Sequence, residues 1–328
     1  MYPRQKNGPD IKYNITGSML LKKKKTSIQL QGGLGNHIFQ YAAAKYLASI
    51  KNSTLEIDKI RIGKGMAAQY GFLLDQIFND FEIKKMKKNK YINVIFEKFF
   101  IFKGRVVSAV SRRSAILQKL VIKFFKTYHS NEVGYDSNLE NLPGAISLNG
   151  YFQTWKYADF LIRKNDFEIS TYNLSNWYFK MKKDAEVVKP VILHVRRGDY
   201  KLVADKFGLL SKEYYLNALN FLPGHLKMRE IWVFSNEIHL AKAMFSESGQ
   251  YNFKFIELET SSSPVEALLL MLQGQAHIIA NSTFSYWGAY LSQNSEVIIA
   301  PTKWFQNMND PKDLLPPNWL RVQSVWEN

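Results

Sequence analysis

The sequence predicts an α/β protein built from two halves, each with a parallel sheet and flanking helices. From residue 190 onward, short β-branched and apolar runs alternate with segments of helical periodicity. Near residue 27, a strand pattern passes through a glycine turn into another helical segment. A polar, charged stretch ending in Pro190 separates these regions. We therefore expect two doubly wound halves that face each other across a cleft.

Composition is typical of a soluble globular protein. The chain has 328 residues, of which 46% are hydrophobic and 22% charged, enough for two cores of ordinary size. It contains no cysteine, which excludes disulfides, thiolate metal sites and a cysteine nucleophile and suits a reducing cytoplasm. No stretch approaches the roughly 20 apolar residues that span a bilayer, and no secretory leader is evident. We therefore expect a cytoplasmic protein.

Changes in composition suggest three regions. Residues 1–26 lack periodicity and are expected to form a disordered basic leader. Residues 27–185 are expected to form the first domain, which includes a basic aromatic insertion. Residues 186–328 are expected to form the second domain.

The positive charge is concentrated before residue 130. Lysine and arginine number 44 against 28 acids, giving a net charge of +16. The cluster Lys84–Lys90 is followed by a stretch to His129 in which lysine and arginine alternate with aromatic and aliphatic residues. Such a stretch can lie on an anionic membrane, bind nucleic acid, or form helices with a solvated basic face. Because no nucleic-acid-binding motif accompanies the charge, we expect no nucleic acid and favour a membrane over it, with helices that have a solvated basic face as the alternative.

Residues 27–50 are predicted to form a strand, a glycine turn and a helix. Ser27–Gln31 alternates polar and apolar residues, and Gly32–Asn36 follows. Apolar residues then recur with helical spacing as far as Ile50. This geometry presents backbone N–H groups to an anion. The third glycine of a dinucleotide fingerprint and a Walker lysine are both missing, so a tight turn without a ligand is the alternative.

The second half contains regular βα units. Strands are expected at Val191–Val195, Ile231–Phe234, Phe253–Ile256, His277–Ala280 and Val297–Ala300, and helices near 211–222, 237–247, 263–275 and 284–293. One helix start is well marked, because Ser263 and Glu266 have the spacing of a capping box and Pro264 occupies the first helical position. We therefore expect Glu266 to be a helix cap rather than a catalytic acid.

The decapeptide VILHVRRGDY, residues 191–200, places charged side chains at the end of a buried strand. Arg196, Arg197 and Asp199 would emerge at the carboxyl edge of the sheet, where α/β proteins bind ligands. Guanidinium groups match phosphate oxygens, and Gly198 allows a close backbone turn. The motif thus predicts a phosphate site, with a surface ion pair as the alternative.

A third motif has the same organisation. Residues 278–287, IIANSTFSYW, run from a strand into small hydroxyl residues and then into a helix. The hydroxyls of Ser282 and Thr283, with the amides that follow, are placed to bind a phosphate. The alternative is simple capping of the helix.

Taken together, GGLGNHIFQYAAAKYLA, HVRRGDY and IIANSTFSYWGAYL, with IIAPTKWF at 298–305, resemble the motifs of the α-1,2-fucosyltransferases, glycosyltransferase family 11. The resemblance implies a GT-B arrangement, GDP-fucose as donor, inverting transfer to the 2-hydroxyl of a galactose-ended glycan, and no cofactor or metal. The sequence agrees on the metal, because it contains no Asp-x-Asp triplet. Residues 27–185 would form the acceptor side and 186–328 the donor-binding side.

The resemblance also assigns individual residues. His194 and Arg196 match the family's pair at the diphosphate, and Arg197 belongs to the same motif. Other matches are the motif acid Asp199, the donor-side turn Asn281, Ser282 and Thr283, and the cleft loop Gly33, Gly35 and Asn36. The sequence departs from the family at His37, where glutamine is common, and at Tyr286, where tryptophan is usual.

Two roles are expected to carry the chemistry. Arg196 would stabilise the negative charge that grows on the departing GDP. The general base is expected to be Asp199, although a carboxylate paired with Arg197 would have a lowered pKa and act only as an orienter. His37 is a third candidate, whose alternative role is local hydrogen bonding at the helix start.

The sequence leaves two other functions open. A glycosyltransferase of the same fold could use a different nucleotide-sugar donor. A non-catalytic basic protein could bind anionic lipid or nucleic acid. The leading expectation is a cytoplasmic enzyme, peripheral at the inner face of the membrane, that acts on an O-antigen or capsule precursor.

Overall fold

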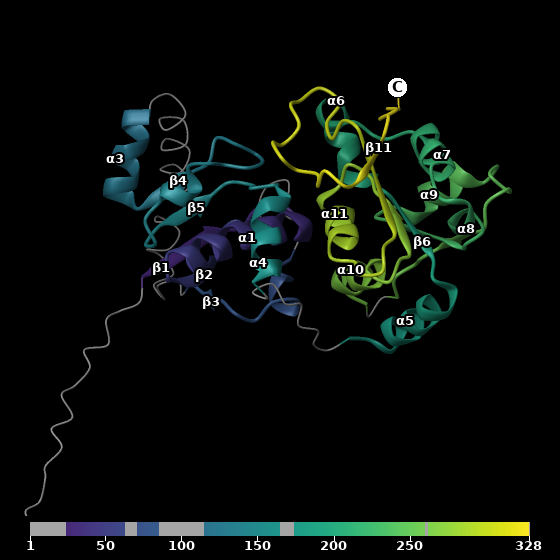
Figure 1. Ribbon diagram of the computed structural model, residues 1–328, viewed down its shortest axis with the longest axis horizontal. Coiled ribbons are helices and arrows are strands. Elements are labelled where there is room, and N and C mark those ends of the chain that lie inside the picture. The colour runs from purple at the N-terminus through teal and green to yellow at the C-terminus, as the bar shows by residue number, and fades with distance from the viewer. Residues whose placement is uncertain (1–23, 63–70, 85–114, 165–173, 260–261, 328) are drawn as a thin grey trace, which may run out of the picture.

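Two α/β halves, each with its own parallel sheet, make up the chain in the computed structural model (Figure 1). The residues described are 24–62, 71–84, 115–164, 174–259 and 262–327. This architecture confirms the predicted α/β class and the GT-B-like pair of Rossmann-like halves.

The first sheet has the strand order β3-β2-β1-β5-β4, and every neighbouring pair is parallel. Its strands are β1 (Lys25–Gln29), β2 (Thr54–Asp58), β3 (Glu82–Ile83), β4 (Thr127–His129) and β5 (Ser147–Asn149). Its helical elements are α1 (Leu34–Ile50), η2 (Leu74–Gln76), α3 (Ala115–Phe125), η3 (Leu139–Asn141) and α4 (Trp155–Arg163). Ile28, Ile57 and Leu148 are fully buried. They form the sheet's share of the core, against which α1 packs.

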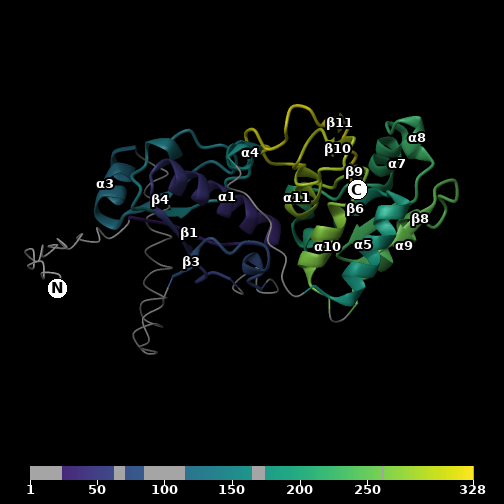
Figure 2. The same ribbon diagram turned by 60° about the horizontal axis from the view of Figure 1, so that its bottom comes forward.

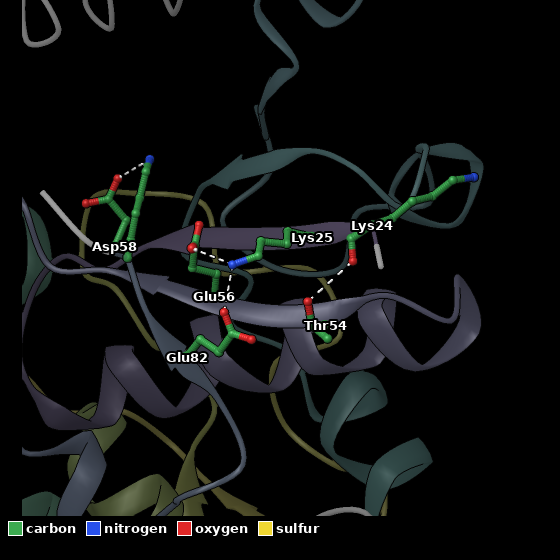
Figure 3. Close-up of polar contacts among 7 residues, drawn as sticks. Lys24, Lys25, Thr54, Glu56, Asp58 and Glu82 are labelled. Atoms are coloured by element: carbon green, nitrogen blue, oxygen red, sulfur yellow. Dashed lines mark hydrogen bonds and ion pairs between the residues drawn. The ribbon is translucent and has the colours of Figure 1, made fainter. Parts of the chain in front are cut away.

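Strands β1, β2 and β3 of this sheet carry opposite charges on neighbouring residues (Figure 3). Lys25 Nζ lies 3.3 Å from Glu56 Oε1 and 2.7 Å from Glu82 Oε2. Hydrogen bonds to Glu82 and Glu56 raise the pKa of Lys25. Lys84 pairs with Asp58 at 2.9 Å in the same region. These pairs connect three adjacent strands, β1, β2 and β3, on the solvent side.

The second sheet has the order β11-β10-β9-β6-β7-β8, again with parallel neighbours. Its strands are β6 (Val191–Val195), β7 (Ile231–Ser235), β8 (Phe253–Phe255), β9 (Ala276–Ile278), β10 (Val297–Pro301) and β11 (Leu320–Val322). Every residue of β6 is buried, as expected for a central strand covered on both faces. Both ends of β6 are where the sequence predicts them.

The four helices predicted in the second half, near 211–222, 237–247, 263–275 and 284–293, are present, though shorter, and the described residues form three further helices that were not predicted. The helices are α5 (Asn176–Val188), α6 (Ala204–Phe207), α7 (Lys212–Asn220), α8 (Gly224–Lys227), α9 (Ile238–Phe245), α10 (Pro264–Met271) and α11 (Thr283–Tyr290), with the 3₁₀ turn η4 (Gly198–Val203) after β6. At the start of α10, Ser263 Oγ accepts from Val265 N at 3.1 Å, and Pro264 stands at the first position, as predicted.

The predicted capping role of Glu266 needs a correction. Its carboxylate does not complete a box in its own helix. It accepts hydrogen bonds from the backbone N–H and the hydroxyl of Ser175, just before α5. Glu266 is buried, and these bonds satisfy its charge. It therefore fixes the start of a neighbouring helix, a role that sequence spacing does not show.

The halves meet directly through α1 and α11, which adjoin in both views (Figures 1 and 2). The Phe39 ring lies 4.7 Å from Tyr286 and 4.6 Å from Trp287, centroid to centroid. Trp287 Nε1 donates to Gly35 O at 2.9 Å. A loop after β10 returns to the first half, where Asp313 pairs with Lys156 at 2.7 Å. Buried aromatic packing thus joins the two sheets into one body.

The predicted leader 1–26 overlaps ordered structure at its end. Strand β1 begins at Lys25, and the buried Thr26 hydroxyl lies 2.6 Å from Ser53 Oγ. Lys25 and Thr26 therefore belong to the sheet, although their composition predicts a disordered leader. Residues 1–23, and most of the basic aromatic insertion, at 85–114, lie outside the described residues. Within the described part, no helix is both long and apolar enough to cross a membrane.

Candidate active site

Each sheet contains one point where the strand order reverses, and the sequence motifs lie there. In the second sheet this switch point is between β6 and β9, and in the first it is between β1 and β5. Ligands of open α/β sheets bind at such points, outside the carboxyl ends of the strands. Arg196 directly follows β6, and the Asn281–Thr283 turn follows β9. The topology therefore brings these two motifs together.

Tyr200 connects them. The guanidinium carbon of Arg196 lies 4.9 Å from the centroid of the Tyr200 ring, a cation–π contact. The Tyr200 hydroxyl donates to Asn281 O at 3.0 Å. The Tyr200 side chain thus contacts the arginine and links the segment after β6 to the turn after β9. Tyr200 was not predicted as a site residue; its sequence signal is its place four residues after Arg196, in η4.

Arg197 does not lie with Arg196. Its side chain is buried, with Nη1 2.5 Å from Glu327 Oε2 and Nη2 donating to Leu210 O at 3.4 Å. Its backbone N–H donates to Asn236 Oδ1 at 2.9 Å. Successive side chains of extended backbone point in opposite directions, so adjacent arginines cannot both face the switch point. We therefore reassign Arg197 from donor binding to holding the C-terminal residues on the second half.

The backbone of Asp199 lies in η4, but its side chain lies outside the described part of the structure. Its role as general base remains a prediction. Among the described side chains, the acidic partner of Arg197 is Glu327.

The residues of the turn after β9 make different contacts. The buried Asn281 amide donates to Phe207 O at 2.9 Å, Gly208 O at 3.3 Å and Trp304 O at 3.1 Å, so we reassign it from donor binding to holding loops. Ser282 is buried at the N-cap of α11, yet its hydroxyl makes no capping hydrogen bond among the described residues. Thr283 begins the helix and is half-buried. Simple capping therefore does not account for this serine.

The glycine turn of the first half touches this hydroxyl turn. A Cβ added to Gly35 would lie 2.4 Å from Thr283 C and 2.6 Å from Phe284 N, closer than any side chain permits. Gly32 has φ +83°, which favours glycine. Gly33 occupies the N-cap of α1, and its carbonyl accepts from His37 N at 3.0 Å. The predicted loop thus lies against the predicted turn, in backbone contact.

Gln153 is a polar residue of this site that the sequence analysis missed. It follows β5, at the switch point of the first sheet, and its Nε2 donates to Asn36 Oδ1 at 2.9 Å. Its Oε1 is buried and has no hydrogen-bond partner among the described residues. A buried amide oxygen left unpaired costs about 1–3 kcal/mol, so it marks a place for a ligand or water. Its only sequence signal is a glutamine within an aromatic cluster.

Two histidines of the site are held neutral. Burial lowers the pKa of His37 to about 4, and the Gly32 carbonyl partly offsets this shift. Neither ring nitrogen of His37 makes a hydrogen bond to the described residues. Burial, and then the charge of Arg196, lower the pKa of His194 to about 3. The His194 ring lies 6.0 Å from the Phe284 ring, beside the hydroxyl turn. His37 is fully buried and weakly basic, which does not favour it as a general base.

No group of three or more His, Asp or Glu side chains gathers as metal ligands in the part of the chain that the structure describes. Independence from metal remains a prediction. The arrangement offers one cationic side chain and a hydroxyl turn on the second half, opposite neutral amides and glycines on the first. Such a pair suits a diphosphate on one side and sugar hydroxyls on the other.

Comparison with known proteins gives a consistent result. Residues 25–323 match the model of Glycosyl transferase family 11. The sequence is similar to an Alpha-1,2-colitosyltransferase of Escherichia coli, 30% identical over 308 residues, covering 90% of this chain and 98% of that protein. It is 26% identical over 315 residues to the O-antigen biosynthesis glycosyltransferase WbnK of Escherichia coli, covering 89% and 99%. It is 23% identical over 212 residues to Galactoside 2-alpha-L-fucosyltransferase SEC1 of Bos taurus, covering 60% and 57%.

Proposed function

The chain belongs to glycosyl transferase family 11, and from this we propose that it moves fucose from GDP-fucose to the 2-hydroxyl of a galactose-ended glycan, an O-antigen or capsule precursor. The observation that carries the proposal is Arg196, held over Tyr200 beside the Asn281–Thr283 turn, at the switch point of the second sheet. A cation at this position suits the diphosphate of a nucleotide sugar.

The second half would stabilise the leaving group. During transfer the acceptor oxygen bonds to the anomeric carbon, the bond from that carbon to GDP breaks, and negative charge grows on the diphosphate. Arg196, with the Ser282 hydroxyl, would bind that charge where it develops. Removing such a contact costs about 3–4 kcal/mol, or a hundredfold or more in rate.

The first half would orient the acceptor. Asn36 and Gln153 form a neutral pair next to the glycine turn, and Gln153 Oε1 is an acceptor without a partner among the described residues. Such amides bind sugar hydroxyls without attracting the anionic donor. The acceptor proton would pass to Asp199, which follows Arg196 in the same motif. His37 is the weaker candidate, because its lowered pKa makes it a poor base.

A second donor is supported by one observation. The relative that is 30% identical is named a colitosyltransferase, and colitose is fucose without its 3-hydroxyl. A GDP-colitose donor would use the same contacts to the diphosphate. The two donors would differ only where the site meets that hydroxyl.

The test is a donor competition. The purified full chain is incubated in EDTA with GDP-fucose, GDP-colitose or GDP-mannose and a β-galactoside acceptor, and the product linkage is determined by NMR. We expect an α-1,2-fucosylated product. Faster transfer from GDP-colitose would replace fucose in the proposal, whereas preference for GDP-mannose or a strict need for Mn²⁺ would overturn it.

A further inference from the structure

Helix α3 lies at the outer edge of the first half, at the end of the molecule farthest from the second half (Figures 1 and 2). It packs beside β4, where Gln118 Nε2 donates to His129 O at 3.4 Å and Ile122 contacts the core. Gln118 and Ile122 thus define the inner side of the helix. The opposite side faces solvent.

That outer side is apolar. Ile116 is 72% exposed, Leu120 44% and Phe124 70%. These residues recur every fourth position and therefore form one continuous stripe along the helix. Single exposed apolar residues are ordinary, but a continuous stripe is a mark of an interaction surface. The sequence pattern alone did not predict which residues form this exposed surface.

Lysines lie beside the stripe on the same side. Lys119 and Lys123 fall between its apolar residues on the helix, and both are exposed, as is Lys126 directly after it. Lys123 Nζ lies 5.9 Å from the Phe124 ring centroid. In the sequence from Lys84 to Asn131, Glu97 is the only acidic residue. An occupant must therefore take apolar side chains and carry negative charge next to them.

We propose that the exposed face of α3 docks on an anionic lipid bilayer, with Leu120 and Phe124 entering the interface and the lysines at the headgroups. A bilayer supplies both components at the right depth. Nucleic acid would pair with the lysines but leave the apolar stripe exposed. A second copy would place lysines against lysines. The inference deepens the proposed function, on which it rests for its purpose, because a bilayer would bring the enzyme to lipid-linked glycans.

The experiment measures co-sedimentation of the full chain with phosphatidylcholine vesicles, with or without phosphatidylglycerol. Leu120→Gln/Phe124→Gln removes the apolar contact, and Lys119→Gln/Lys123→Gln removes the charge. Helix α5 offers matched controls, Phe179→Gln/Val187→Gln and Lys180→Gln/Lys183→Gln, because these residues are exposed on the second half. Circular dichroism checks that each variant folds.

We expect binding only to the anionic vesicles, and a loss of about 25-fold for the lysine variant, from about fivefold per lysine. The apolar variant should lose at least about tenfold, and the α5 variants should bind like the unchanged protein. Equal losses for α3 and α5 variants, binding to duplex oligonucleotides in preference to vesicles, or a dimer broken by the α3 changes would each overturn the proposal. All variants should keep transfer to a soluble acceptor, so failure of docking is distinguishable from failure of the proposed function.

Discussion

The two switch points have the same topology but carry different side chains after their strands. At the second sheet, Arg196 stands over an aromatic ring next to a hydroxyl turn. At the first sheet, the turn consists of glycines and the neutral pair Asn36 and Gln153. A duplicated architecture can therefore serve two unlike ligands, because the few residues after each strand decide the chemistry.

The same lesson holds for two adjacent residues. Arg196 lies at the switch point, whereas Arg197 is buried against Glu327 and Leu210. Arg196→Ala should lower kcat at least about 100-fold with little change in the unfolding midpoint, because it removes charge stabilisation from the transition state. Arg197→Met is the matched control, which should lower the midpoint and keep kcat per folded molecule. Steady-state kinetics and thermal unfolding test both, and interchanged effects would reverse our assignments.

The next largest effect is expected where the halves touch. Gly35→Ala forces a Cβ into the Thr283 backbone, so the two turns must separate. We expect a cost of about 1–3 kcal/mol in stability and at least about tenfold lower kcat/KM. Gly249→Ala is the control, since nothing lies within 4 Å of a Cβ there. An unaffected Gly35→Ala enzyme would show that the contact does not set the site's geometry.

Tyr200 tests how the second switch point is held. Tyr200→Leu removes the ring beneath Arg196 and should lower kcat about tenfold while leaving acceptor KM unchanged. Tyr200→Phe keeps the ring and loses the hydroxyl's bond to Asn281, so kcat should fall about threefold. If the two variants behave alike, the hydroxyl and not the ring positions the arginine.

Gln153 tests the neutral side. Gln153→Ala should raise the KM for the galactoside about tenfold, the value of one lost hydrogen bond to a sugar hydroxyl, and leave the KM for GDP-fucose unchanged. Initial rates at varied acceptor and donor separate the two constants. A rise in the KM for GDP-fucose instead would contradict the assignment of the first half to the acceptor and the second half to the donor.

The last test concerns the dependence of stability on pH. His37 and His194 resist protonation when folded, with pKa values of about 4 and about 3, but gain a proton near pH 6.5 when unfolded. Stability should therefore fall as pH drops from 6.5 towards 4, by at most about 1.4 kcal/mol per pH unit for each histidine. His37→Gln should flatten this slope in denaturant titrations, and lost activity in that variant would restore His37 as a candidate base.

The sequence predicted the second half better than the first for a physical reason. Strand β6 is a continuous apolar run because both of its faces are covered, so both its ends were predicted. Strand β3 has two residues, both exposed, and gives no hydrophobic pattern. Of the site, the three motifs were predicted and the structure brings them together. The directions of Arg197 and Asn281 and the roles of Tyr200 and Gln153 depend on tertiary packing, which spacing does not encode.

The return of Asp313 to the first half has a mechanical consequence. Its carbonyl accepts from Thr154 Oγ1 at 2.7 Å, and Lys312 O accepts from Tyr135 N at 2.9 Å. This loop therefore joins the two halves in addition to the α1–α11 packing and the covalent connection, and the combination resists a hinge motion that would separate the halves. Substrates would then enter by local rearrangement of the surface segments, with the lobes keeping their spacing through each turnover.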